Sequence, residues 1–75
     1  MARIYHSGGD VILEGYGRLD SDAQAHLADV TKDEFFAAMK ARDVEAFRAA
    51  KETGKQLLRA RQEARRWMRA GQGVA

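Results

Sequence analysis

The sequence predicts an α+β fold in which an N-terminal two-stranded antiparallel β-hairpin precedes two or three α-helices, the last of them long and basic. Three observations support this class. Two adjacent glycines, Gly8 and Gly9, separate short apolar runs near the N-terminus. Residues that cap helices recur from Asp20 onward. The chain contains no proline, so none interrupts the final helical stretch.

Residues 1–17 are predicted to form the hairpin. Gly8 and Gly9 can both adopt positive φ, as a two-residue type I′ turn requires. A turn centred on this pair fixes the register, with the pairs Arg3–Glu14, Ile4–Leu13, Tyr5–Ile12, His6–Val11 and Ser7–Asp10. This register joins opposite charges at the open end and gathers aliphatic residues on one face. Gly15 and Gly17 are expected to end the second strand.

Residues 20–42 are predicted to hold one or two short helices. Asp20 or Ser21 can cap the first of them. Thr31 is followed three residues later by Glu34, a capping-box pattern that predicts the start of a second helix.

Residues 44–70 are predicted to form one long amphipathic helix, capped by Asp43 and followed by a tail over residues 71–75. At ~1.5 Å per residue, such a helix is nearly 40 Å long. Gly54 is its weak point, because a glycine inside a helix costs ~1 kcal/mol relative to alanine. Its place in the middle of the apolar face favours close packing by another helix over a kink or a break.

Length and composition limit the class of protein. We expect one domain over residues 1–75, with a marginal core, because so short a chain buries only about 60% of its unfolded surface. The absence of cysteine excludes disulfides and thiolate metal sites. No signal-peptide run or long apolar stretch is present, so we expect a cytoplasmic protein without a membrane partner. Two open strand edges favour a homodimer, or addition of one edge to a partner's sheet.

Charge is distributed unevenly along the chain. Residues 1–50 carry nine acidic and six basic groups, a balance of −3, whereas residues 51–75 carry seven basic and two acidic groups, a balance of +5. Such asymmetry bears on partners rather than on fold, and it favours binding over catalysis.

A helical projection of residues 44–70 gathers six basic side chains in a sector of roughly 80° beside the apolar face. They are Arg48, Lys51, Lys55, Arg59, Arg66 and Arg69. A cationic row on a rigid helix suits a polyanion, because each neutralised phosphate releases counterions. One alternative is a solvated face in which Arg48–Glu52 and Arg59–Glu63 form ordinary i,i+4 pairs. Another is contact with an acidic protein surface.

Arg61 and Arg65 project toward the centre of the apolar face. Since burying unpaired arginines is expensive, the core is expected to thin out there and the helix to project past the globule. Trp67 then lies on an arginine-rich segment, where it stacks on bases or anchors a partner, unless it folds back onto the hairpin. In composition alone, residues 59–67 resemble the arginine-rich helices that read RNA hairpins.

No catalytic or metal-binding constellation is evident. His6 and His26 lack a second ligand at metal spacing, and Ser7 and Asp10 are better explained as turn residues. The Gly15–Gly17 stretch lacks the later glycine or lysine of a phosphate loop. We therefore expect no enzyme activity, metal ion, cofactor or small-molecule substrate.

Two classes of function remain. The first is a non-enzymatic binding module whose basic C-terminal helix contacts the backbone of RNA or DNA. The second is a small protein-binding adaptor or inhibitor of the phage or mobile-element type, such as an anti-CRISPR-like inhibitor of a nucleic-acid enzyme. The predicted binding residues are the same for both classes: Arg48, Lys51, Lys55, Arg59, Arg61, Arg65, Arg66, Trp67 and Arg69.

Overall fold

The computed structural model describes residues 3–72 and confirms the α+β class. It contains a three-stranded antiparallel sheet followed by two long helices, where the sequence predicted a two-stranded hairpin and two or three helices. The elements are β1 (Ile4–Ser7), β2 (Asp10–Leu13), β3 (Gly17–Leu19), α1 (Ser21–Ala41) and α2 (Val44–Gln72). Of the predicted tail, residues 71 and 72 belong to α2, and residues 73–75 lie outside the described residues.

The hairpin of β1 and β2 has the predicted register. The paired residues are Ile4–Leu13, Tyr5–Ile12, His6–Val11 and Ser7–Asp10. The prediction of positive φ at both glycines was wrong, since Gly8 has φ +59° and Gly9 has no positive φ. At Gly9 a Cβ would lie 2.6 Å from Cγ of Met68, so the Met68 side chain would have to move. Gly8 therefore provides the positive φ of the turn, and Gly9 leaves room for the Met68 side chain of α2.

The sheet has a third strand that the sequence analysis missed. Gly15 and Gly17 have φ +86° and +116°, and the Tyr16 N–H donates to the Leu13 carbonyl at 3.0 Å. The chain therefore reverses at the point where the glycines were expected only to end a strand. Residues 17–19 return alongside β2, which gives the strand order β1-β2-β3.

Helix α1 is one helix of 21 residues, not one or two short ones. Its N-cap is Asp20, whose Oδ1 accepts from the Ala23 N–H at 2.8 Å, as predicted. The capping box predicted at Thr31 does not form. Instead, the Thr31 hydroxyl donates to the Leu27 carbonyl at 2.7 Å, inside the continuous helix. This bond satisfies a buried hydroxyl without ending the helix.

A two-residue turn joins α1 to α2. Arg42 adopts the left-handed conformation with φ 54°, and Asp43 caps α2 as predicted, since its Oδ1 accepts from the Ala46 N–H at 3.1 Å. Helix α2 then continues through Gly54 without a break over 29 residues. In the described part of the chain, no helix combines the length and the apolar content needed to cross a membrane.

Gly54 faces α1, but the two helices are not so close there that a methyl group is excluded. A Cβ at this position would lie 3.8 Å from Cγ2 of Thr31, which is an ordinary van der Waals contact. The neighbouring helix that the sequence predicted is present. Close packing nevertheless does not explain the glycine.

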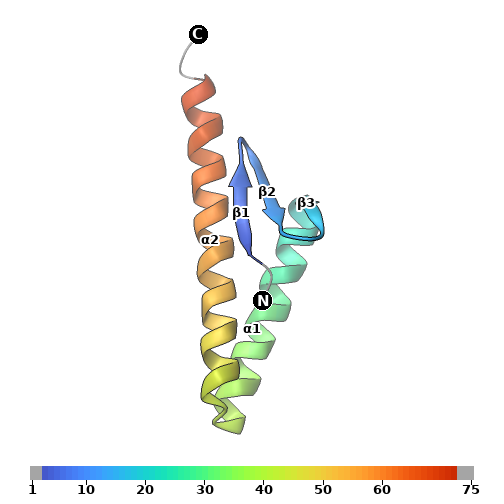
Figure 1. Ribbon diagram of the computed structural model, residues 1–75, viewed down its shortest axis with the longest axis vertical. Coiled ribbons are helices and arrows are strands. Elements are labelled where there is room, and N and C mark those ends of the chain that lie inside the picture. The colour runs from blue at the N-terminus through green and yellow to red at the C-terminus, as the bar shows by residue number, and fades with distance from the viewer. Residues whose placement is uncertain (1–2, 73–75) are drawn as a thin grey trace.

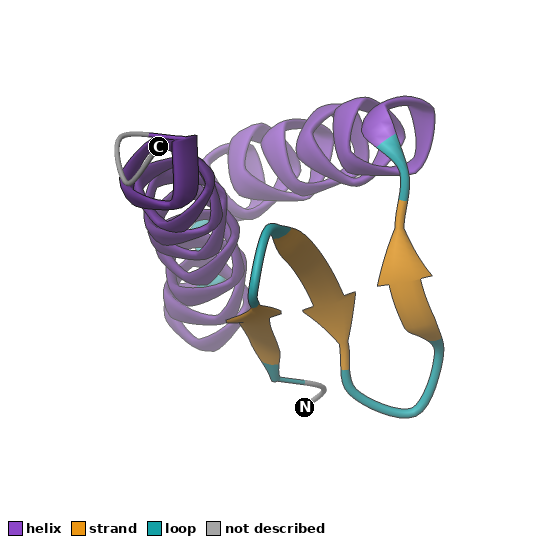
Figure 2. Ribbon diagram, turned by 90° about the horizontal axis from the view of Figure 1, so that it is seen from above, coloured by secondary structure: helices purple, strands orange, loops and turns teal. Residues whose placement is uncertain are grey.

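The molecule is elongated, with extents of 52 × 21 × 19 Å. Its radius of gyration is 14.1 Å, compared with about 11 Å for a compact domain of this length. The two helices lie side by side near their turn and diverge away from it, and the sheet lies between the diverging halves (Figure 1). Viewed along the long axis, the sheet covers one side of the helix pair (Figure 2). The C-terminal end of α2 extends beyond the hairpin, as predicted.

The core lies where the sheet meets α2 and the first turns of α1. Its buried members are Ile4, Val11, Leu19, Leu57, Ala60 and Ala64. Small residues on α2 let the sheet approach the helix closely. No large side chain within residues 3–72 is completely buried, so this core is thin.

A candidate nucleic-acid interface on α2

Helix α2 carries eight basic side chains, and all of them are exposed. They are Arg48, Lys51, Lys55, Arg59, Arg61, Arg65, Arg66 and Arg69. The ion pairs found among residues 3–72 join Arg3 to Glu14, His6 to Glu63 and Arg18 to Asp10, and none involves a cation of α2.

Glu52 and Glu63, the acids that could pair with Arg48 and Arg59, interact with other groups. Oε2 of Glu63 lies 3.1 Å from Nε2 of His6 on β1. Oε1 of Glu52 accepts from Gln56 Nε2 at 3.5 Å. The alternative in which Arg48–Glu52 and Arg59–Glu63 form i,i+4 pairs is therefore not what the structure shows. For Glu63 the position of β1 explains the difference, because this strand places His6 beside the Glu63 carboxylate.

Gln56 also closes the free edge of β1. Its Oε1 accepts from the Ile4 N–H at 2.8 Å, so a backbone donor that would point to solvent has a partner on α2. The homodimer remains a prediction, but along this part of β1 a second strand would have to displace α2.

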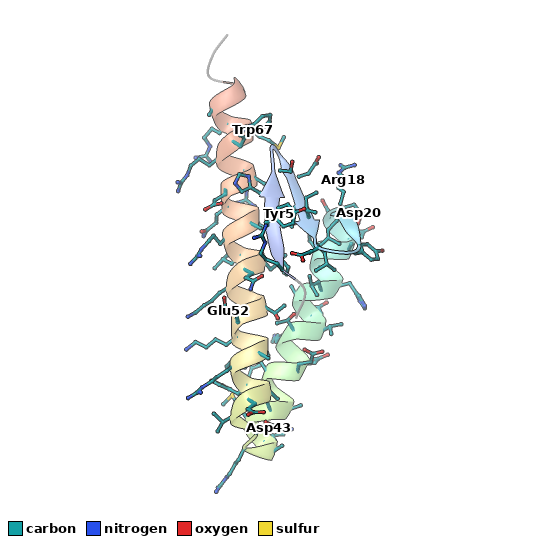
Figure 3. The ribbon with its side chains drawn as sticks, viewed as in Figure 1. Tyr5, Arg18, Asp20, Asp43, Glu52 and Trp67 are labelled. Atoms are coloured by element: carbon teal, nitrogen blue, oxygen red, sulfur yellow. The ribbon has the colours of Figure 1, made fainter. Side chains whose placement is uncertain are left out.

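Six of the eight cations form a row that we call the basic stripe: Arg48, Lys51, Lys55, Arg59, Arg66 and Arg69. From Arg48 to Arg69 the row rises about 32 Å along the helix. Nitrogen-tipped side chains line the side of α2 that faces away from the sheet and α1 (Figure 3). These six exposed residues follow one another along α2. At the border with the sheet, Arg59 and Arg66 line hollows that also contain His6 and Glu63.

Arg61 and Arg65 are separated from the stripe. Beyond Leu57, the buried line on α2 moves around the helix to Ala60 and Ala64, which contact the sheet. The position that Arg61 occupies is therefore outside the core, where its side chain borders a groove between α1 and α2. Arg65 lies one turn further along the same side. Both arginines are exposed, as the expected thinning of the core required.

Trp67 lies on the hairpin side of α2 and not on the stripe (Figure 3). A Cβ at Gly8 would lie 3.6 Å from the Trp67 ring, so the indole packs over the hairpin turn. The alternative in which Trp67 folds back onto the hairpin is thus the one the structure shows. The side chain still exposes 57% of its surface, because the helix extends past the sheet here.

The two histidines lie in unrelated places. His6 is half-buried, with Nδ1 3.3 Å from the Gly8 carbonyl oxygen and Nε2 against Glu63, whereas His26 is exposed on α1. Asp10, a turn residue in the sequence analysis, pairs with Arg18 at 3.0 Å. Between residues 3 and 72, no group of three histidine, aspartate or glutamate side chains lies close enough to hold a metal ion.

A polar row on α2, which lies beside β1, was not predicted from the sequence. Glu52, Gln56 and Glu63 recur at spacings of four and seven residues, which places them on one side of a helix. This periodicity is visible in the sequence. It predicts contact with the sheet only if the hairpin is known to lie along that side of α2.

Comparison of the chain with protein-family models, with curated proteins and with solved structures finds no match. The function must therefore be inferred from the residues of the site and their geometry.

Proposed function

We propose that this protein is a non-enzymatic binding module whose basic stripe binds the phosphate backbone of a nucleic acid. One observation carries the proposal. Among residues 3–72, six exposed cations stand in a row without an ion-pair partner, while Glu63 of the same helix pairs with His6 and Glu52 bonds Gln56. Like charges at helical spacing destabilise one another, and a polyanion relieves this repulsion while its bound counterions are released.

The dimensions of the stripe suit a phosphate backbone. Its length of about 32 Å is close to one turn of B-form DNA, ~34 Å. Four of its six residues are arginines, and the guanidinium fork can donate two hydrogen bonds to one phosphate. Because phosphate contacts carry no sequence information, we expect binding with little preference for base sequence.

Trp67 has a supporting role in this proposal. Its ring packs on the hairpin turn, so it holds the end of α2 against the sheet. We therefore expect the arginines to supply most of the affinity and Trp67 to supply stability.

The test compares two variants with the same change in net charge. The stripe variant carries Arg59→Gln, Arg66→Gln and Arg69→Gln. The control variant removes three exposed cations elsewhere, through Arg18→Gln, Lys40→Gln and Arg42→Gln. Fluorescence anisotropy with a short DNA duplex and an RNA hairpin, at low salt, gives the affinities.

The stripe variant should bind on the order of tenfold or more weakly than the wild type, because three phosphate contacts are lost. The control should stay within about threefold of the wild type, since general attraction to a polyanion falls equally in both. Equal weakening of the two variants would contradict the proposal. So would a wild type that binds neither probe, and that outcome would favour an acidic protein partner.

A further inference from the structure

Several large apolar side chains of the helix pair lie outside the core. Four of them expose about half of their surface or more: Phe36 49%, Met39 51%, Val44 58% and Leu58 57%. The buried positions on both helices are filled mainly by alanines, which are Ala38, Ala50, Ala60 and Ala64. A partner that covers the four larger side chains therefore gains hydrophobic stabilisation that the fold itself leaves unused.

Two adjoining hollows lie between α1 and α2, which run side by side near their turn (Figure 1). The first, of about 470 Å³, is lined by both helices and, among residues 3–72, by no strand residue. The second, of about 450 Å³, lies toward the turn, and Lys51 lines both. Together we call them the interhelical groove, which extends along α2 from Arg61 to Val44, about 26 Å. Its large apolar lining residues include Phe35, Phe36, Met39, Phe47, Leu57 and Leu58.

The charged side chains that line the interhelical groove are nearly all basic. The only acid among the described residues that line it is Asp43, whose carboxylate caps α2. None of the basic residues takes part in the ion pairs found within residues 3–72. All of them are exposed: Lys32 on α1, Arg42 in the turn, and Arg48, Lys51 and Arg61 on α2.

We propose that the interhelical groove binds an amphipathic helix of a partner protein, with apolar side chains on one face and carboxylates beside them. The apolar face covers Phe36 and Leu58, and the carboxylates pair with the cations of the groove. Lys32 and Arg61 matter most for the argument, because they line the groove and are not part of the basic stripe.

This site is separate from the proposed phosphate-binding surface over most of its length. Arg48 and Lys51 border both surfaces, whereas Arg59, Arg66 and Arg69 do not line the interhelical groove. The proposal therefore does not depend on nucleic-acid binding.

The lining of the groove favours a helix over an extended segment. Both walls are helices, whose backbone groups are bonded internally, and the Thr31 hydroxyl already donates to the Leu27 carbonyl. An extended segment would therefore leave its own buried N–H and C=O groups without partners, whereas a helix satisfies its own backbone. A third helix packs on two others at ~8–10 Å and places side chains at i, i+3, i+4 and i+7 between them.

The same side chains argue against other occupants. A nucleic acid would meet the cations but leave Phe36 and Leu58 exposed. A second copy of this chain, set groove to groove, would oppose cations to cations. A helix without charges would cover the apolar residues but desolvate the rim without pairing it. The occupant that answers both features is apolar and acidic at once.

Three synthetic peptides of about 16 residues, long enough to follow the groove, test the site. The first has leucines at the spacing i, i+3, i+4 and i+7 and glutamates beside them. The second has lysines in place of the glutamates, and the third has serines in place of the leucines. In fluorescence anisotropy, the wild type should bind the first peptide about tenfold or more tightly than either of the others, because only the first matches both the apolar lining and the cations.

A charge inversion tests the role of the two cations outside the stripe. The variant Lys32→Glu/Arg61→Glu should bind the glutamate peptide about tenfold or more weakly than the wild type and the lysine peptide more tightly, because the charge of the site is reduced and partly reversed. The control Arg18→Glu/Lys40→Glu has the same change in net charge at exposed residues that do not line the groove. It should keep the preference for the glutamate peptide.

A second pair of variants tests the apolar contact. Leu58→Ser should weaken binding of the first peptide about fivefold or more, because the leucine surface that the peptide covers is lost. Tyr16→Ser is the control, since Tyr16 is 74% exposed and does not line the groove, and it should leave the affinity unchanged.

Each of four outcomes would overturn the proposal. The wild type binds none of the peptides, or it binds the serine peptide as tightly as the first, which would leave only attraction to a polyanion. The charge-inverted variant keeps the wild-type preference. Sedimentation equilibrium shows a wild-type dimer that Leu58→Ser converts to the monomer, which would assign the groove to a second copy of the chain.

Discussion

Polar residues on the two long sides of α2 differ in whether they have partners inside the chain. On the side that faces β1, Glu63 meets His6 and Gln56 accepts from the Ile4 N–H. On the side away from the core, the cations of the basic stripe have no acidic partner among the residues that the structure describes. The net charge of the helix hides this division. Whether the polar residues on a side of α2 have partners inside the chain depends on the element that packs against that side.

The same comparison assigns different roles to the two sides. The side toward the sheet holds the fold together, because it contributes Leu57, Ala60 and Ala64 to the core. The side of the stripe contributes no buried residue and is free to bind. Substitutions on the sheet side should therefore change the free energy of unfolding, and substitutions on the stripe should change binding.

The largest effect on stability is expected for Leu57→Ala. Leu57 is 4% exposed, and removing its side chain leaves a cavity between α2 and the sheet, at a cost of about 2–4 kcal/mol. The matched change on the open side, Arg59→Ala, should lie within about 0.5 kcal/mol of the wild type. Urea unfolding followed by far-UV circular dichroism measures both. Similar losses for the two variants would remove the distinction between the sides.

Trp67→Ala should come next, at about 1–2 kcal/mol, since only part of the indole is covered by the hairpin turn. Because the ring is not on the stripe, affinity for duplex DNA should change less than twofold. Unfolding curves and anisotropy on the same samples separate the two properties. A variant that keeps its stability and loses affinity for single strands would move Trp67 to the binding side, as the sequence analysis also considered.

Gln56→Ala should cost roughly 1 kcal/mol, because the Ile4 N–H loses its partner while remaining partly buried. Gln62→Ala is the control, since Gln62 is an exposed residue of the same helix and type. Hydrogen exchange provides a local readout: the Ile4 amide should exchange faster in Gln56→Ala alone. Unchanged protection of that amide would argue against the edge contact.

The smallest expected effect is a gain. Gly54→Ala should raise stability by about 0.5–1 kcal/mol, because helix propensity improves and the Cβ meets Thr31 only at 3.8 Å. Gly8→Ala should lower stability instead, since Gly8 has φ +59°. A lower melting temperature for Gly54→Ala would restore the interpretation that α1 packs too closely there for a side chain.

The sequence predicted those structural features whose geometry depends on residues close together in the chain. The glycine pair and the apolar alternation gave the register of β1 with β2, and Asp20 and Asp43 were identified as helix caps. These features depend on neighbours within a few residues. The charge separation along α2 was likewise visible in its periodicity.

What the sequence could not provide depends on contacts between distant segments. Gly15 and Gly17 can end a strand or reverse it, and the choice is made by the pairing of β3 with β2. Thr31 can cap a helix or stay inside one, and packing against α2 favours the second. Glu63 follows Arg59 by four residues and could pair with it, but β1 places His6 beside the Glu63 carboxylate instead. The binding residues themselves are still predictions.

The salt dependence of nucleic-acid binding tests the central claim most directly. The affinity of the wild type for duplex DNA, plotted as log K against log salt concentration, should fall with a slope on the order of −0.9 for each stripe cation that contacts a phosphate. The variant Arg59→Gln/Arg66→Gln/Arg69→Gln should show a slope that is shallower by about 2–3, since three contacts are removed. A wild-type slope near zero, or equal slopes for the two proteins, would contradict the assignment of the basic stripe as a phosphate-binding face.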